Sequence, residues 1–116
     1  MGIGVGVLKE ELGYDLSSAD YTFDSVNAGD FVKDYACKVY GIYFHFTTEQ
    51  AKTVEIALKR TSGGTTYVIY YEKKSLPTET DWVWKHDLEL PATIEIEVKV
   101  SQTDGACSMN MLITYK

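Results

Sequence analysis

The chain has 116 residues, of which 45% are hydrophobic and 24% charged, the size and composition of one globular domain. Its net charge is −6 and Arg60 is its single arginine, so it lacks the basic surface on which nucleic-acid binding depends. No apolar run approaches the roughly 20 residues that a membrane helix requires. We therefore expect neither nucleic acid nor a membrane as a partner.

Glycines occupy alternate positions at the start of the chain. Such a strand carries side chains on one face only and costs much conformational entropy to order. Residues 1–19 are predicted to form an extended arm, with at most one helical turn at 8–12, and residues 20–116 a single domain. Two interpretations stay open: an edge strand or frayed terminus of its own domain, or an arm that adds to a neighbouring subunit. In the second case the partner-binding residues are Gly2, Ile3, Gly4, Val5, Gly6, Val7 and Leu8.

Seven strands are predicted in the body, and the last two carry the clearest pattern. Residues 94–100 alternate apolar and polar side chains, a turn follows at 102–105, and a second alternation runs from Cys107 to Tyr115. Because strand side chains point to opposite faces with period two, this pattern indicates strands packed on one side. Short strands with frequent turns and no helix of consequence predict an all-β fold, an antiparallel β-sandwich of jelly-roll-like type. The predicted strands are 21–26, 37–47, 52–60, 65–72, 81–85, 93–101 and 106–115.

Two of these strands are apolar on both faces. In 65–72, regular alternation places Tyr67, Ile69 and Tyr71 on one face and Val68 and Tyr70 on the other. A two-sided apolar strand is covered on both faces or meets a partner. Since a small two-layer sandwich has little with which to cover a second face, we expect a homo-oligomer, with a trimer favoured. The candidate subunit-interface residues are Tyr40, Tyr43, Tyr67, Tyr70 and Tyr71.

The two cysteines are predicted to be free thiols. Cys37 begins one strand and Cys107 the last strand. If these strands are antiparallel, the cysteines lie about 30 Å apart at ~3.3 Å per residue. A disulfide requires Cα atoms within about 7 Å. Unpaired thiols are consistent with folding in a reducing cytoplasm.

The reactive residue types do not form a recognisable catalytic or metal-binding motif. His45 and His86 lie far apart in the sequence and share no ligand spacing with the cysteines, which argues against zinc. The acidic 79–89 segment could bind calcium or supply paired carboxylates, but solvated loop carboxylates are the simpler interpretation. Nucleophile and phosphate-binding motifs are lacking. We therefore expect no enzyme, no catalytic or metal-ligating residues and no cofactor.

Trp82 and Trp84 lie two positions apart and so share one face of their strand. Inward-facing indoles would belong to the core or to a subunit contact. Exposed indoles would form a platform on which sugar rings stack, so a carbohydrate-binding module is the main alternative function.

The order of elements across residues 36–115 resembles small β-sandwich virion proteins of tailed bacteriophages. The similar features are a strand ending Phe44-His45-Phe46-Thr47-Thr48, a hairpin from Thr53 to Tyr70, a tryptophan strand with an acidic loop from Trp82 to Leu90, and a closing hairpin ending Leu112-Ile113-Thr114-Tyr115. The resemblance implies a non-enzymatic capsid decoration (cement) protein that binds the major capsid protein or other virion subunits. It would be located in the virion, assembled in the host cytoplasm, and a tail or neck assembly subunit is a further alternative.

Overall fold

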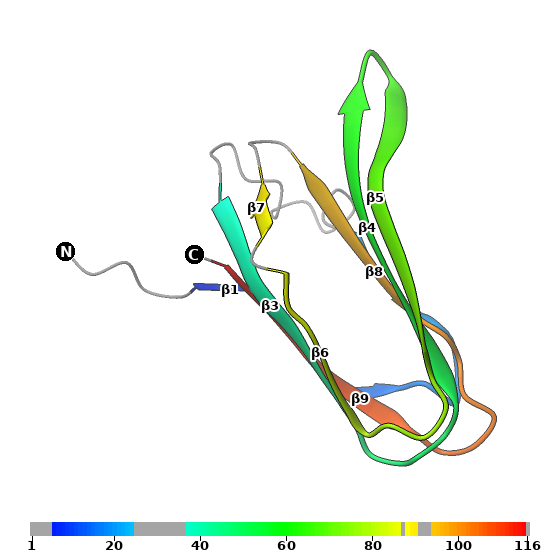
Figure 1. Ribbon diagram of the computed structural model, residues 1–116. Helices are drawn as coiled ribbons and strands as arrows, with labels where there is room; N and C mark the ends of the chain where they lie inside the picture. Colours follow the sequence, from blue (N-terminus) through cyan, green and yellow to red (C-terminus); the bar gives the residue numbers. More distant parts are fainter. Residues whose placement is uncertain (1–5, 25–36, 87, 91–93, 116) are drawn as a thin grey trace.

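The computed structural model describes residues 6–24, 37–86, 88–90 and 94–115. Within this part of the chain all regular structure is β-strand (Figure 1). The strands are β1 (Gly6–Asp15), β2 (Tyr21–Asp24), β3 (Cys37–Phe46), β4 (Lys52–Ser62), β5 (Thr65–Leu76), β6 (Asp81–Trp84), β7 (Leu88–Leu90), β8 (Glu95–Val100) and β9 (Ser108–Tyr115). The short strand β7 was not predicted.

The strands form two antiparallel sheets. Sheet A has the order β1-β9-β3-β6, with β7 also paired to β3, and sheet B has the order β2-β8-β4-β5. The pairing is nested along the chain: β1 pairs with β9, β2 with β8, β3 with β6 and β4 with β5. The two sheets face each other as layers that meet at one end and diverge at the other (Figure 1). The predicted antiparallel β-sandwich is confirmed, and the nested order is compatible with a jelly-roll-like arrangement.

The core lies between the inner faces of the two sheets. Ile42, Phe44 and Phe46 of β3 point inward, opposed by Ile96 and Val98 of β8 in the other sheet, and all five are buried. Alternate residues of the same strands, such as those at 43, 45, 97 and 99, are half-buried or exposed. The predicted period-two pattern therefore holds in both layers, and burial of these apolar side chains is the main favourable term in folding.

Residues 6–15 differ from the predicted arm. They form β1, an edge strand whose pairs with β9 run from Gly6↔Tyr115 to Asp15↔Ser108. Leu8 is buried in the core cluster, where a helical turn was expected. The edge-strand interpretation thus applies to Gly6, Val7 and Leu8, because β9 offers a free edge and the core takes up the leucine. Residues 2–5 of the proposed arm lie outside the described residues.

A bulge in β5 changes which side chains share a face. Tyr70 lies opposite Leu58 of β4, whereas Val68 lies opposite the next residue, Lys59, so Ile69 is an extra residue in β5. Such a residue interrupts the alternation of a strand. Tyr71 therefore shares the outer face with Val68, and Tyr67 the inner face with Tyr70. The expectation that Tyr67 and Tyr71 lie on one face is wrong for this reason.

Among the described strands of sheet B, no third strand pairs with the far end of the β4–β5 hairpin. Strand β4 pairs with β8 only from Val54 to Lys59, whereas its pairing with β5 continues to Ser62↔Thr65. The hairpin accordingly projects past the end of β8 (Figure 1).

Candidate functional site

The most exposed apolar side chains of β5 lie on the projecting hairpin. Tyr67, Val68, Ile69 and Tyr71 are between 52% and 60% exposed, and we call these four residues the hairpin surface. Tyr71 also donates a hydrogen bond to the Glu55 carboxylate, which raises the pKa of its phenol. Val68 and Tyr71 share the outer face and Tyr67 the inner face, so the four residues surround one exposed edge strand and do not lie on a single face. Exposed apolar side chains gathered around one sheet edge are typical of a protein contact.

β5 is also the least protected sheet edge among the described strands. β2 and β6 are four residues long, and β1 carries charged residues at positions 9–11 and two bulges. β5 has 12 residues and no charge between Thr65 and Tyr71. Short strands, bulges and charges are the devices that keep edges from pairing with other chains. The bulge at Ile69 is the one such device in this part of β5.

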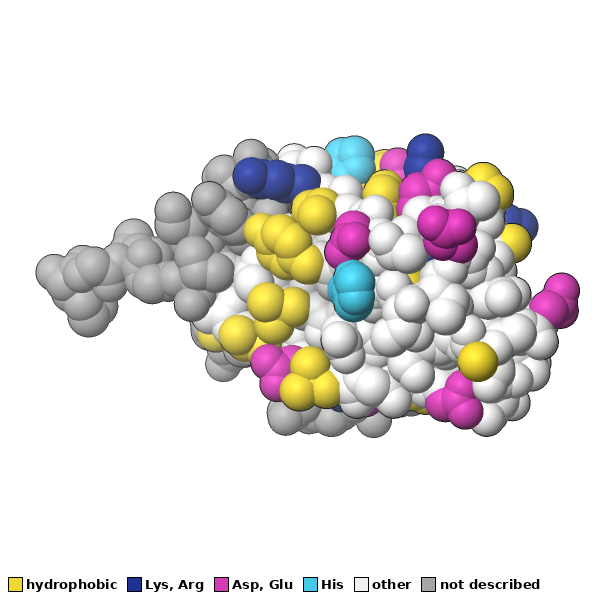
Figure 2. Space-filling view, turned by 90° about the horizontal axis from the view of Figure 1, so that it is seen from below, with side chains coloured by type: hydrophobic (Ala, Val, Ile, Leu, Met, Phe, Trp, Pro, Cys, Tyr) yellow, Lys and Arg dark blue, Asp and Glu magenta, His cyan; other side chains and the backbone are white. Residues whose placement is uncertain are grey.

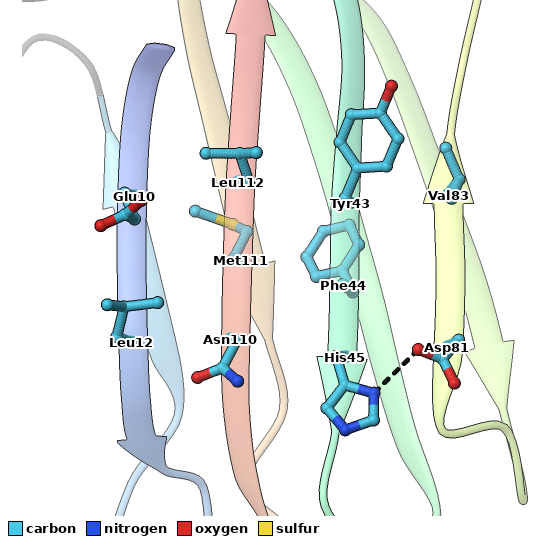
Figure 3. Close-up of a pocket in the computed structure, with 10 residues that line it drawn as sticks. All are labelled: Glu10, Leu12, Tyr43, Phe44, His45, Asp81, Val83, Asn110, Met111 and Leu112. Atoms are coloured by element: carbon cyan, nitrogen blue, oxygen red, sulfur yellow. Dashed lines mark hydrogen bonds and ion pairs between the residues drawn. The ribbon is translucent and has the colours of Figure 1, made fainter.

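A second surface lies on the outer face of sheet A, seen in Figure 2 as hydrophobic side chains beside a histidine and carboxylates. It is a shallow groove of about 350 Å³ crossed by four strands. Leu12 is 67% and Val83 46% exposed, and Tyr43 and Leu112 are half-buried between them. The groove is defined by eight outward side chains, Glu10, Leu12, Tyr43, His45, Asp81, Val83, Asn110 and Leu112, which we call the sheet A groove (Figure 3).

The sheet A groove is polar at one end and negatively charged. His45 Nδ1 lies 2.8 Å from Asp81 Oδ1 across the β3–β6 pair (Figure 3). The hydrogen bond from His45 lowers the pKa of Asp81, desolvation opposes this shift, and a hydrogen bond from Thr80 supports it. Asp81 therefore stays ionised at neutral pH. Glu10 adds a second carboxylate, and the described residues that line the groove include neither lysine nor arginine.

The predicted interface tyrosines do not form one surface. Tyr43 lies in the sheet A groove, with its ring over Gly41, where an added Cβ would be 3.1 Å away. Tyr67 and Tyr71 belong to the hairpin surface on sheet B. Tyr70 points inward, half-buried against the core and 6.2 Å from the His86 ring. The side chain of Tyr40 lies outside the described residues.

Trp82 and Trp84 point inward. Trp84 is 1% exposed, and Trp82 stacks on Phe44 with 5.6 Å between ring centres. They belong to the core, so the structure excludes an exposed indole platform formed by these two residues. Asp81 and Val83, the alternate positions of β6, are the ones that face outward.

The cysteines and acidic groups do not come together as a metal site in the described part of the chain. Cys107 is a free, buried thiol beside the end of β3 that holds Phe46, and Cys37 begins that strand at its other end. Among the described residues no group of three or more His, Cys, Asp and Glu side chains is placed to hold a metal ion. No helix long and apolar enough to cross a membrane occurs there either. Asp87 of the acidic segment lies outside the described residues.

Sequence reasoning missed most of the sheet A groove. Leu12, Val83 and Leu112 are apolar residues at outward positions of their strands, a signal that was readable only once strand direction and neighbours were known. The groove joins β1, β9, β3 and β6, which are far apart in the sequence.

Comparisons with known proteins give weak likenesses. No protein-family model and no curated protein matches the chain. One similar solved structure is titled "Structure of infectious bursal disease virus Gx strain", at 14% identity and a TM-score of 0.37. Another bears the same title for the Gt strain, at 16% identity and a TM-score of 0.38. The chain is covered to 95% and 97%, but it spans only 29% and 28% of those chains. At this level the likeness defines neither an activity nor a partner.

Proposed function

We propose that the chain is a non-enzymatic virion structural protein that binds and stabilises a phage capsid shell, as a decoration (cement) protein. The observation that carries the proposal is the pair of exposed apolar surfaces, on opposite sheets of one small sandwich. Exposed apolar side chains do not stabilise an isolated monomer, whereas contacts with neighbouring subunits would bury them. The resemblance of residues 36–115 to tailed-phage virion proteins supports this assignment.

The proposed partners are the major capsid protein or other virion subunits, and further copies of the chain, in a trimer. A trimer that contacts three shell subunits multiplies weak contacts through avidity. The proposed location is the virion, after assembly in the host cytoplasm. Strand addition by the arm is now confined to residues 2–5, because Gly6 and Val7 are already paired with β9 and Leu8 is buried in the core.

Co-sedimentation tests the proposal. The purified protein is mixed with heads of the encoding phage assembled without it, and with heads that already carry it as the control. Saturable binding to the first heads alone, with increased resistance of those heads to heat, is expected. Lack of binding to either preparation would exclude a shell protein. Gold labelling that marks only the tail or neck of intact particles would instead favour the tail or neck alternative.

A carbohydrate-binding module remains the second candidate, now on the sheet A groove. The groove holds the Tyr43 ring together with His45, Asp81, Asn110 and, two strands away on β1, Glu10. These polar groups are suited to orienting a small ligand. Glycans that shift the NMR signals of these groove residues, at concentrations that leave shell binding unchanged, would favour this function. The tryptophan fluorescence should respond little, because both indoles point inward.

A further inference from the structure

The hairpin surface and the sheet A groove are complementary in chemistry. The hairpin surface offers two tyrosines and two branched aliphatic side chains, and the groove offers Leu12, Val83, Tyr43 and Leu112. Each is flanked by charge. Contacts of this kind, with an apolar centre and a polar rim, are typical of specific protein interfaces.

Their charges are opposite in sign. Residues 55–74 of the hairpin contain the cations Lys59, Arg60, Lys73 and Lys74 and the carboxylates Glu55 and Glu72, so the cations are in excess. Glu55 lies opposite Lys73 and accepts a hydrogen bond from Tyr71. Lys59 is paired with Glu97 at 2.8 Å, which offsets part of this charge. The described lining of the groove contributes the carboxylates of Glu10 and Asp81 and no lysine or arginine. Complementary charges raise the association rate and fix orientation more than they add affinity.

The two surfaces of one chain cannot meet each other. The groove lies on the face of sheet A that points away from sheet B, whereas the hairpin belongs to sheet B and projects past its end (Figures 1 and 3). Direct pairing of two β5 edges is disfavoured by the bulge at Ile69, which interrupts the row of backbone groups that a partner strand would need. A contact made by side chains in a groove has no such requirement.

We propose that the hairpin surface of one copy docks into the sheet A groove of a second copy. The contact is heterologous, so each copy uses its hairpin once and its groove once, and such contacts generate a ring when the rotation closes. This inference rests on the oligomer in the proposed function and names the surfaces that build it. It is tested with the purified protein alone, so its failure leaves shell binding by a monomer open.

The test uses two double variants that alter exposed side chains. The hairpin variant is Val68→Asp with Ile69→Asp, and the groove variant is Leu12→Lys with Val83→Lys. Matched controls are Ser75→Asp, exposed farther along β5, and Thr22→Lys, exposed on β2. Mass is measured by size-exclusion chromatography with light scattering against the 13.0 kDa of one chain, and circular dichroism checks the fold.

The wild type and both controls are expected to be oligomeric and both double variants monomeric. An equimolar mixture of the two variants should form a dimer, because the intact hairpin of one fits the intact groove of the other. A monomeric wild type, a monomeric mixture, or a groove variant that stays oligomeric would each overturn the proposal. The last result, with a monomeric hairpin variant, would point to hairpin-to-hairpin contacts instead.

Hydrogen exchange on the wild type provides a test that needs no variant to fold. Dilution should increase exchange in residues 67–71 and 81–83 together, at the concentration where the oligomer dissociates. If dilution increases exchange in residues 67–71 but leaves residues 81–83 unchanged, docking of the hairpin surface into the groove is contradicted.

Discussion

Lys52 is a charged side chain placed among apolar residues. It is 3% exposed, its Nζ donates a hydrogen bond to the Glu79 carbonyl oxygen at 2.8 Å, and it lies 4.3 Å from the centre of the Phe46 ring. Burial lowers the pKa of this ammonium, and the neighbouring Cys107 and Glu79 side chains oppose the shift. The four-carbon stem is the part that fills space in the core.

We therefore expect Lys52→Ala to destabilise the fold by about 2–4 kcal/mol, through lost packing and a cavity. Lys52→Met keeps the stem and should cost clearly less. Denaturant unfolding measures both.

Stability should also depend on pH through this residue. The pKa of Lys52 in the folded state lies below the ordinary 10.5. Between these two values the unfolded chain binds more protons than the folded one, so the stability of the wild type rises with pH through this window. Lys52→Met should remove this rise of stability with pH. Equal losses of stability in Lys52→Ala and Lys52→Met would contradict a packing role for the four-carbon stem.

The Asp81 carboxyl should titrate below its usual value of 3.8, because the hydrogen bond from His45 stabilises its ionised form. His45→Ala should move the titration midpoint back toward 3.8, as followed by carbon NMR of the side chain. A lowered folded pKa adds stability above the unfolded value and loses it as pH falls through the folded one. An unchanged midpoint in His45→Ala would show that the His45–Asp81 contact is not maintained in solution.

At the scale of the element, β1 is an edge strand of sheet A and not a free arm. Removal of residues 1–5 leaves every described contact in place. Removal of residues 1–12 takes away Leu8 and the pairs from Gly6↔Tyr115 to Glu11↔Met111. We expect the longer truncation to lower Tm by about 10 °C or more and the shorter one to have little effect, since a buried leucine contributes about 2–4 kcal/mol. Thermal unfolding followed by circular dichroism distinguishes them, and equal Tm values would contradict the pairing of β1 with β9.

Single-residue deletions in β5 test where its bulge lies. Deletion of Ile69 joins Val68 to Tyr70, which already lie opposite the consecutive residues Lys59 and Leu58 of β4. Regular pairing can then continue with every other side chain on its present face, so we expect little loss of stability. Deletion of Glu72 in the same strand shifts the register and turns its neighbours to the wrong face. Denaturant unfolding should rank Glu72 deletion as far more damaging, and the reverse order would refute the bulge assignment.

For the whole molecule, the opposite charges of the hairpin and the sheet A groove predict an assembly that weakens with sodium chloride. Attraction between exposed charges is screened within about 10 Å at ~0.1 M salt and about 3 Å at ~1 M. The dissociation constant from sedimentation should therefore rise between these concentrations. Asp81→Asn should reduce that dependence, whereas Asp104→Asn, exposed in a turn outside the groove, serves as the control. An oligomer insensitive to salt would indicate that the charges do not face each other.

The alternation of apolar and polar residues determined the all-β class and the inward faces of β3, β6, β8 and β9, because a period of two is a local property that any strand displays. The inward direction of Trp84 follows from the same rule, once Asp81 and Lys85 are seen at polar positions. These features could be predicted without knowing which strands are neighbours.

Sheet order, bulges and exposure were decided only by the tertiary structure. Pairing of β1 with β9 joins the two ends of the chain, and the face of Tyr71 depends on one extra residue, Ile69. The sheet A groove exists because four strands distant in sequence lie side by side. The hairpin surface lies on β5, which is an edge strand of sheet B, and only Tyr67 lies beyond the last pair of β4 with β8. Long-range pairing chooses these neighbours, and local periodicity carries no information about them.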